Sequence, residues 1–347
     1  MKNRKWIFVF ISLAVLLPVS DEASGQDIPM LAYEMRMNGD PHGAIALLDS
    51  ALLLYPDSAR MWFEKGRCVD WTKMEGCSKF THTWKYVVPR LKSGRRCFSK
   101  AVALEPDNAR YHYWASQNGS LLAFTGIYSP WKWPVVPFLF RRMVNEAESA
   151  VELDPGNPEY RFQLVVLSRF GGLLGGNKKM ARAHADTLDR IDPVYGTMAY
   201  KELETKKHPY DSYHRYLELE GEHPDHPMLL QKLAQINSNS GPEHFSTARH
   251  YYRRMLELDP ENTLAIKELV RTMNRYGQDG AVGEIQSYLR NVGSSYLYYQ
   301  AVGHQLIGQQ YQRLGSRSLA DEHFRLAARM NPSNNSTNIT DLKRPEK

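Results

Sequence analysis

Apolar residues recur at intervals of three and four in the C-terminal part of the chain, and polar residues separate them. In the segment 263–276 the apolar positions are Ile266, Leu269, Val270 and Met273. This spacing places them on one face of an α-helix and leaves the opposite face polar. The same period at 227–258 and 281–290 predicts further amphipathic helices.

The segment 300–332 shows how two such helices pair. Gly308 and Ala320 are small residues at the predicted crossing of the helices, where they let the two backbones approach. Tyr311 and Phe324 are predicted to fill the gap to the neighbouring hairpin. Gly315 suits the turn between the helices. The segment therefore predicts an antiparallel hairpin.

The spacing in this segment resembles the tetratricopeptide repeat (TPR), with its pattern W-x2-L-G-x2-Y, A-x3-F and P over about 34 residues. His304 stands at the position of the Trp. The resemblance implies an all-α fold, a TPR-like α-α superhelix or solenoid of about seven helical hairpins. The residues assigned to repeat packing are Trp62, Gly66, Gly308, Tyr311, Ala320, Phe324 and Ala327.

Prolines recur at the expected ends of second helices because a proline cannot continue a helix. We expect a helical repeat domain over 26–331, with insertions near 77–95 and 129–140 and an irregular part at 195–223. Residues 332–347 are polar and predict a disordered tail. The prolines used as boundaries are Pro56, Pro106, Pro155, Pro193, Pro224, Pro260 and Pro332.

The predicted insertion at 129–140 contains three prolines, which argue against a helix, and several aromatic residues, among them Trp131 and Trp133. It is too short to cross a bilayer, which takes about 20 residues. Three alternatives stay open for its aromatic side chains: packing back on the solenoid, docking a partner, or shallow contact with a membrane.

The first 25 residues have the organisation of a signal peptide. A basic start is followed by the apolar run Trp6–Leu17 and by the small residues Ala23, Ser24 and Gly25. The sequence therefore predicts an exported protein of bacterial type, located in the periplasm or cell envelope. An uncleaved N-terminal anchor is the alternative.

Composition and charge fit a soluble helical protein. The net charge of +6 indicates a mild preference for acidic partners, and the basic residues are too dispersed along the sequence to indicate nucleic-acid binding. In an exported protein, two of the cysteines Cys68, Cys77 and Cys97 could form a disulfide; free thiols are the alternative.

Candidate chemistry is sparse. The glycine-rich run at 170–179 has Asn177 where a phosphate-binding loop requires Lys, and Met180 follows Lys179 in place of Ser or Thr. It is interpreted as a turn before a helix containing Ala181 and Ala185. The histidines at 208–250 make a metal-dependent enzyme an alternative, although only His223 and His226 are close in sequence. No catalytic motif was found, so the sequence predicts no catalysis, cofactor or metal. The histidines in question are His208, His214, His223, His226, His244 and His250.

The predicted site is a groove between first helices, where proteins of this family usually hold partner segments. Basic and amide side chains recur on the polar faces of the last two clear first helices. Such a surface suits an extended acidic segment of a partner protein. We therefore expect a protein-interaction scaffold of the envelope, with a membrane-docked assembly factor as an alternative; an ordinary solvated face is the simpler interpretation of this polar strip. The predicted groove residues are Lys267, Arg271, Asn274, Arg275, Gln305, Gln309, Gln312 and Arg313.

Overall fold

The computed structural model describes residues 23–72, 83–127, 135–170, 176–205, 210–293 and 295–331. Within these ranges the chain forms sixteen α-helices and no β-strand, which confirms the predicted all-α class. The signal segment 1–22, Cys77, Trp131, Trp133, His208 and the tail 332–347 lie outside the described residues.

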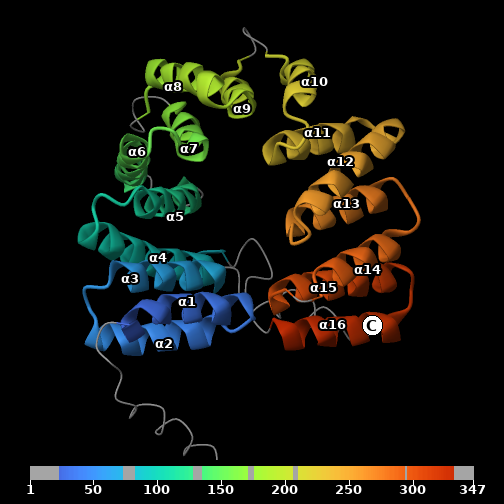
Figure 1. Cartoon of the computed structure of the whole chain (residues 1–347), viewed down its shortest axis with the longest axis horizontal. Coiled ribbons are helices and arrows are strands. Elements are labelled where there is room, and N and C mark those ends of the chain that lie inside the picture. Colours follow the sequence, from blue (N-terminus) through green and yellow to red (C-terminus); the bar gives the residue numbers. More distant parts are fainter. Residues whose placement is uncertain are drawn as a thin grey trace, which may run out of the picture.

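The described helices form eight hairpins that follow one another along an arch (Figure 1). In the first four hairpins the helices are α1 (Ala23–Met37) with α2 (Pro41–Leu54), α3 (Ala59–Trp71) with α4 (Thr83–Leu104), α5 (Ala109–Ile127) with α6 (Val136–Leu153), and α7 (Pro158–Ser168) with α8 (Lys178–Ile191). In the last four they are α9 (Pro193–Leu203) with α10 (Ser212–Glu222), α11 (Pro227–Ser240) with α12 (Phe245–Leu258), α13 (Thr263–Arg275) with α14 (Ala281–Asn291), and α15 (Leu297–Arg313) with α16 (Arg317–Met330).

The sequence predicted about seven hairpins, and the additional one in the structure is α9–α10. It occupies the segment 195–223 that appeared irregular in the sequence. Pro193 follows the end of α8 at Ile191, as predicted, and is also the first residue of α9. Asp192 accepts hydrogen bonds from the backbone N–H groups of Val194 and Tyr195 as the N-cap of α9. Helix α8 therefore passes into α9 through a single residue.

Two predicted insertions are shorter than expected. Residues 83–95 belong to α4, where Val87, Val88 and Leu91 are buried with Leu122 of α5. Residues 136–140 belong to α6, because Pro137 lies in its first turn, where a helix needs no intrahelical N–H donor. The proline argument against a helix was therefore wrong for these residues.

The turns between the first hairpins share a hydrogen bond that reaches back to a proline carbonyl. Trp62 Nε1 donates to Pro56 O at 2.8 Å, and Arg161 Nη2 donates to Pro155 O at 2.7 Å. His112 Nε2 lies 2.9 Å from Pro106 O. In each case the side chain follows its proline by six residues, so the boundary prolines found in the sequence also fix the start of the next first helix.

The spacing of the repeat pattern is explained by contacts between a glycine and a phenylalanine. A Cβ atom on Gly66 would lie 2.7 Å from Phe98 Cε1, and one on Gly308 would lie 2.6 Å from Phe324 Cε1. Each phenylalanine thus packs on the first helix of its own hairpin. The sequence placed Phe324 in the gap to a neighbouring hairpin, whereas the structure shows its ring against Gly308 within its own hairpin.

The first and last hairpins are in contact, so the arch closes (Figure 1). The rings of Trp71 and Tyr298 are 4.7 Å apart, and Leu297 N donates to Asn38 Oδ1 at 3.3 Å. Gly39 has a φ of +85°, and a Cβ atom there would lie 2.3 Å from Met330 O. We call this contact between α1–α3 and α15–α16 the seam.

Candidate functional site: a groove between α13 and α15

The structure gathers the predicted groove residues from two first helices into one depression. This first-helix groove has a volume of about 690 Å³. Seven of the eight predicted residues line it, and Gln312 does not. Its lining residues are Lys267, Glu268, Val270, Arg271, Asn274, Arg275, Gln305, Leu306, Gln309 and Arg313.

The amphipathic pattern of α13 creates the polar wall of the groove. Ile266, Leu269 and Met273 are buried in the core, which turns Lys267 and Arg271 outward. Val270 and Leu306 are buried and also line the groove, so it has apolar lining as well. Val270 is one of the predicted core residues, and Glu268 and Leu306 are groove residues that the sequence did not reveal.

Positive charge dominates the groove, which holds four cationic side chains and one carboxylate. The carboxylate, Glu268, pairs with Arg271 at 2.5 Å, while the Arg271 side chain stays 62% exposed. Lys267 forms no ion pair with any residue that the structure describes. Two cations on neighbouring turns of α13 are therefore accessible to an anionic ligand.

The other two cations are partly engaged in holding the fold. Arg275 Nη1 donates to Ser238 O and to Asn239 Oδ1, both at 2.8 Å, which ties α13 to the end of α11. Arg313 Nη2 donates to Asn274 O at 3.5 Å. Arg275 is thus a poor target for testing ligand binding, because changing it also removes a contact between hairpins.

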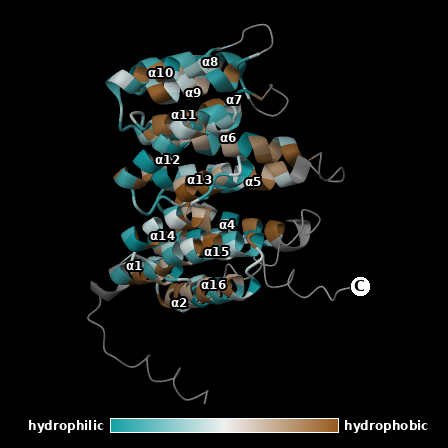
Figure 2. Ribbon diagram, turned by 90° about the vertical axis from the view of Figure 1, so that its right-hand side faces the viewer, coloured by the Kyte–Doolittle hydropathy of each residue, from teal (hydrophilic) through white to brown (hydrophobic). Residues whose placement is uncertain are grey.

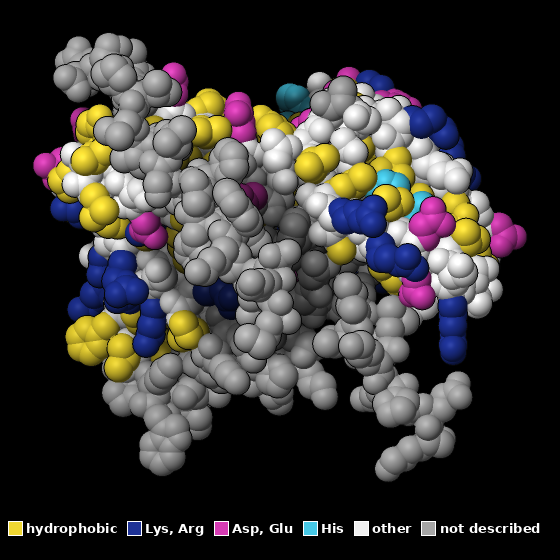
Figure 3. Space-filling model, turned by 90° about the horizontal axis from the view of Figure 1, so that it is seen from below, with side chains coloured by type: hydrophobic (Ala, Val, Ile, Leu, Met, Phe, Trp, Pro, Cys, Tyr) yellow, Lys and Arg dark blue, Asp and Glu magenta, His cyan; other side chains and the backbone are white. Residues whose placement is uncertain are grey.

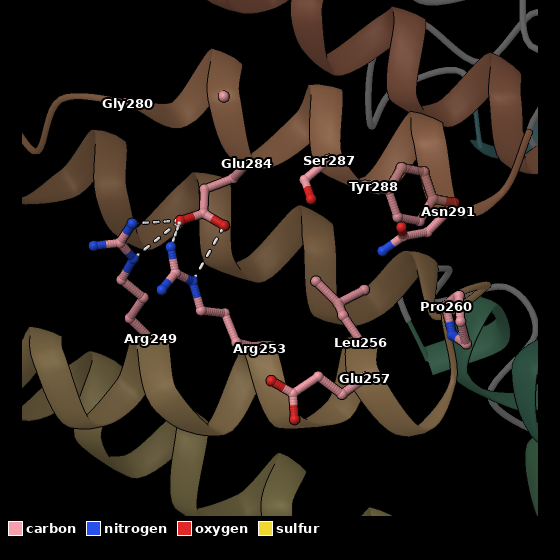
Figure 4. Close-up of a pocket in the computed structure, with 11 residues that line it drawn as sticks. Arg249, Arg253, Leu256, Glu257, Pro260, Gly280, Glu284, Ser287, Tyr288 and Asn291 are labelled. Atoms are coloured by element: carbon pink, nitrogen blue, oxygen red, sulfur yellow. Dashed lines mark hydrogen bonds and ion pairs between the residues drawn. The ribbon is translucent and has the colours of Figure 1, made fainter.

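A second depression, the second-helix groove, lies between α12 and α14 and has a volume of about 500 Å³. Figure 4 shows Arg249 and Arg253 of α12 both directed at Glu284 of α14, with closest contacts of 2.5 and 2.6 Å. Burial raises the pKa of Glu284, but the hydrogen bonds from both arginines outweigh it and leave the pKa below its ordinary value. Here the charges neutralise one another within the protein.

The residues predicted for repeat packing occupy different environments. Ala320 is buried with Phe324, whereas Tyr311 and Ala327 are half-buried because no hairpin follows α16 in the described residues. His304, at the position of the family's Trp, lies with its Nδ1 3.0 Å from His323 Nδ1.

The histidine-rich region does not assemble a metal centre in the described residues, which contain no group of three or more potential ligands. His226 instead caps α11 and lies 3.1 Å from Asp192 Oδ2. Cys68 and Cys97 are free and buried, and burial is the main cause that raises their pKa to about 12 and about 11. Neither thiol is therefore activated as a nucleophile.

None of the described helices combines the length and the hydrophobicity that a membrane-spanning helix needs.

The profile of the tetratricopeptide repeat family matches residues 28–68, which cover α1, α2 and most of α3. The chain carries a tetratricopeptide repeat. The predicted resemblance is confirmed. Among curated proteins, none matches the sequence.

Solved structures with similar tetratricopeptide-type folds share little sequence with this chain. A tetratricopeptide repeat protein from Parabacteroides merdae ATCC 43184 is 11% identical, with a TM-score of 0.37, over 92% of this chain and 96% of that chain. Human IFIT1, crystallised as a dimer with m7Gppp-AAAA, is 14% identical, with a TM-score of 0.41, over 93% and 80%. Yeast Tom70 is 12% identical, with a TM-score of 0.36, over 90% and 77%.

Proposed function

We propose that this chain is a non-catalytic scaffold of the bacterial cell envelope that holds an extended acidic segment of a partner protein in the first-helix groove. The observation that carries the proposal is the accessible pair Lys267 and Arg271 beside the apolar side chains of Val270 and Leu306. Carboxylates of a partner could pair with the cations while an apolar side chain covers the lining.

The amide side chains of α15 support binding of an extended backbone. Gln305 and Gln309 are half-buried and lie one helical turn apart on the wall that faces α13. An amide offers both a donor and an acceptor, as the peptide backbone requires. The groove thus has groups for the backbone of a bound segment as well as for its charges.

The proposed location in the periplasm or cell envelope rests on the N-terminal pattern of basic, apolar and small residues. Ala23, Ser24 and Gly25, the residues expected around the cleavage site, form the first turn of α1. Cleavage before Gln26 would leave the rest of α1 and all later helices in place.

Site-specific photo-crosslinking tests the groove. A photoreactive amino acid at Gln309 is expected to capture an acidic partner segment in native cells, and Lys267→Glu with Arg271→Glu should reduce capture at least tenfold. Two charge reversals worth about 1 kcal/mol each support this magnitude.

The matched control reverses Arg325 and Arg329, two exposed residues of α16 outside the groove. Arg325→Glu with Arg329→Glu should leave capture unchanged. Equal capture by the groove variant and the native chain would show that the partner does not use these cations, and the proposal would be wrong.

A further inference from the structure

A different surface, on α4 and α6, gathers many basic residues. Helix α4 contains six basic residues and no acidic one. Lys92, Arg96 and Lys100 are exposed and lie four residues apart, so they share one side of the helix. None of the three forms an ion pair with a described residue.

The start of α6 extends this positive surface. Arg142 Nη2 donates to Ser99 Oγ at 3.0 Å, which places the first turns of α6 beside α4. Burial is the main cause that lowers the pKa of Arg95, and the positive charge of Arg142 lowers it further. Arg142 also pairs with Glu146 of α6, with Nε 3.8 Å from Oε1. Arg141 is also exposed and has no described partner.

Apolar side chains project directly beside these cations. Phe138 is 74% exposed and Val135 is 52% exposed, and Phe138 precedes Arg141 and Arg142 by three and four residues on the same helix. Figure 2 shows the far end of the α5–α6 hairpin coloured as hydrophobic. Figure 3 shows Lys and Arg side chains bordering hydrophobic ones on the outer left side of the molecule.

We infer that this basic–apolar edge, formed by Lys92, Arg96, Lys100, Arg141, Arg142, Val135 and Phe138, docks the protein on an anionic lipid bilayer. The charge pattern favours this occupant. The phosphates of anionic lipids would lie against the cations, and the Phe138 ring would enter the boundary between headgroups and acyl chains.

The geometry distinguishes docking from insertion. The basic side chains follow the second helices α4 and α6 along their exposed sides, while the apolar side chains sit only at the end of one hairpin. Such an edge would hold the solenoid on the membrane surface with the hairpin end dipped into the interface. This inference does not depend on the first-helix groove, which lies on other helices.

Vesicle flotation of the full chain tests the inference. All samples carry Phe10→Asp and Val15→Asp, which interrupt the N-terminal apolar run so that it does not itself bring the chain to lipid. The vesicles contain phosphatidylcholine alone, or phosphatidylcholine and phosphatidylglycerol in equal parts. The chain should float with the anionic vesicles only, and raising the salt concentration should release it.

Two variants separate the contributions of charge and apolar contact. Lys92→Glu with Arg96→Glu and Arg141→Glu should lower partitioning on the order of a hundredfold, since each basic residue contributes roughly fivefold near an anionic surface. Phe138→Ser should lower it about tenfold. The matched controls, Lys178→Glu with Lys179→Glu and Arg329→Glu, and Leu54→Ser, change exposed residues elsewhere and should leave it unchanged.

Thermal unfolding followed by circular dichroism verifies that each variant is folded, and all the changed residues in the helices are exposed. The inference would be overturned if the chain does not float with anionic vesicles or floats equally with neutral ones. It would also be overturned if the variants and their controls lose partitioning to the same extent. An acidic protein or nucleic acid that binds this edge while vesicles do not would overturn it as well.

Discussion

The two halves of the solenoid differ in the buried contacts that join their hairpins. From α9 to α15 the buried apolar residues form one continuous cluster that extends from Val194 to Ile307. In the N-terminal half the apolar residues divide into several smaller clusters. Buried polar contacts bridge its successive first helices.

These polar contacts join each first helix to the next. Arg36 of α1 donates to Glu64 Oε1 of α3 from Nε and Nη2, at 3.0 and 2.9 Å. Asn118 Nδ2 of α5 donates to Asp70 Oδ1 of α3 at 2.8 Å. Gln163 Nε2 of α7 donates to Ser116 Oγ of α5 at 3.0 Å.

The difference teaches that the same repeat geometry can be maintained with two kinds of interface. An apolar interface tolerates small displacements, whereas a buried hydrogen bond fixes the relative position of two helices because its partners cannot be replaced by water. The N-terminal half should therefore be the more sensitive to single polar substitutions. It also forms one side of the seam, where Arg36 packs 5.0 Å from the centre of the Trp71 ring.

The largest effect is expected for Arg36→Ala. It leaves the Glu64 carboxylate buried without its partner and should lower the free energy of unfolding by about 3–5 kcal/mol in urea denaturation. Arg271→Ala, which breaks an exposed pair, should cost less than about 1 kcal/mol. The double variant Arg36→Met with Glu64→Leu should regain most of the stability that Arg36→Ala loses. If Arg36→Ala costs no more than Arg271→Ala and the double variant regains no stability, the loss does not come from a buried unpaired charge.

Leu269→Ala is expected to have the largest effect in the C-terminal half. Leu269 is fully buried in the continuous apolar cluster, so its truncation should lower the free energy of unfolding by about 3 kcal/mol. Leu264→Ala on the same helix removes a partly exposed side chain and should cost far less. Similar losses for the two variants in guanidinium denaturation would argue against a continuous core.

Asn118→Ala should cost about 1–2 kcal/mol, because it removes one of the hydrogen bonds to the buried carboxylate of Asp70. Gln312→Ala, at an exposed position, should stay within about 0.5 kcal/mol of the native chain. The comparison uses urea denaturation at neutral pH. A negligible effect of Asn118→Ala would show that the polar contacts do not stabilise the N-terminal half.

The smallest effects concern pH, and they have opposite signs in the two halves. The hydrogen bond with Glu146 raises the pKa of His112, so its contribution to stability is complete below about pH 6.5 and is lost as the pH rises through the raised pKa. Burial, and then the charge of His323, lower the pKa of His304; burial also lowers that of His323. Their contribution is present above about pH 6.5 and is lost as the pH falls.

The native chain should lose some stability as the pH rises above about 6.5, and His112→Gln should reduce this loss. The native chain should also lose some stability as the pH falls below about 6.5, and His304→Gln should reduce that loss. Denaturation of both variants and the native chain across this pH range tests the signs. The same direction of change for both variants would contradict the assigned causes.

The repeats were readable in the sequence where apolar spacing and boundary prolines agree, as they do from α11 to α16 except at the α14–α15 boundary, which has no proline. The α9–α10 hairpin was not recognised in the sequence because it has few buried apolar residues, such as Val194, Tyr216 and Leu219. In addition, Pro193 both follows the end of α8 and begins α9, so no separate loop marks the boundary. The first part of helix α4 was not predicted as a helix, in part because Pro89 lies inside it. Its buried side of Val87, Val88 and Leu91 outweighs the local preference against a helix.

Most of the candidate groove was predictable because both of its walls are amphipathic helices whose polar faces follow from local spacing. The sequence did not predict which cations of the groove are accessible and which hold the fold together. That depends on the contacts of Arg275 with Ser238 and Asn239, which are far from it in the sequence. Gln312 was assigned to the groove from its spacing alone, yet it lies outside the lining.

The sequence by itself determined the helical class, the repeat and the polar faces of the helices, since each depends on residues a few positions apart. Only the tertiary structure decided that the arch closes, that polar contacts join the N-terminal first helices, and that α4 and α6 combine their charges on one edge. Leu297 and Asn38 meet across the whole length of the chain. No local pattern encodes such a contact, because it depends on the summed rotations of all the hairpins between them.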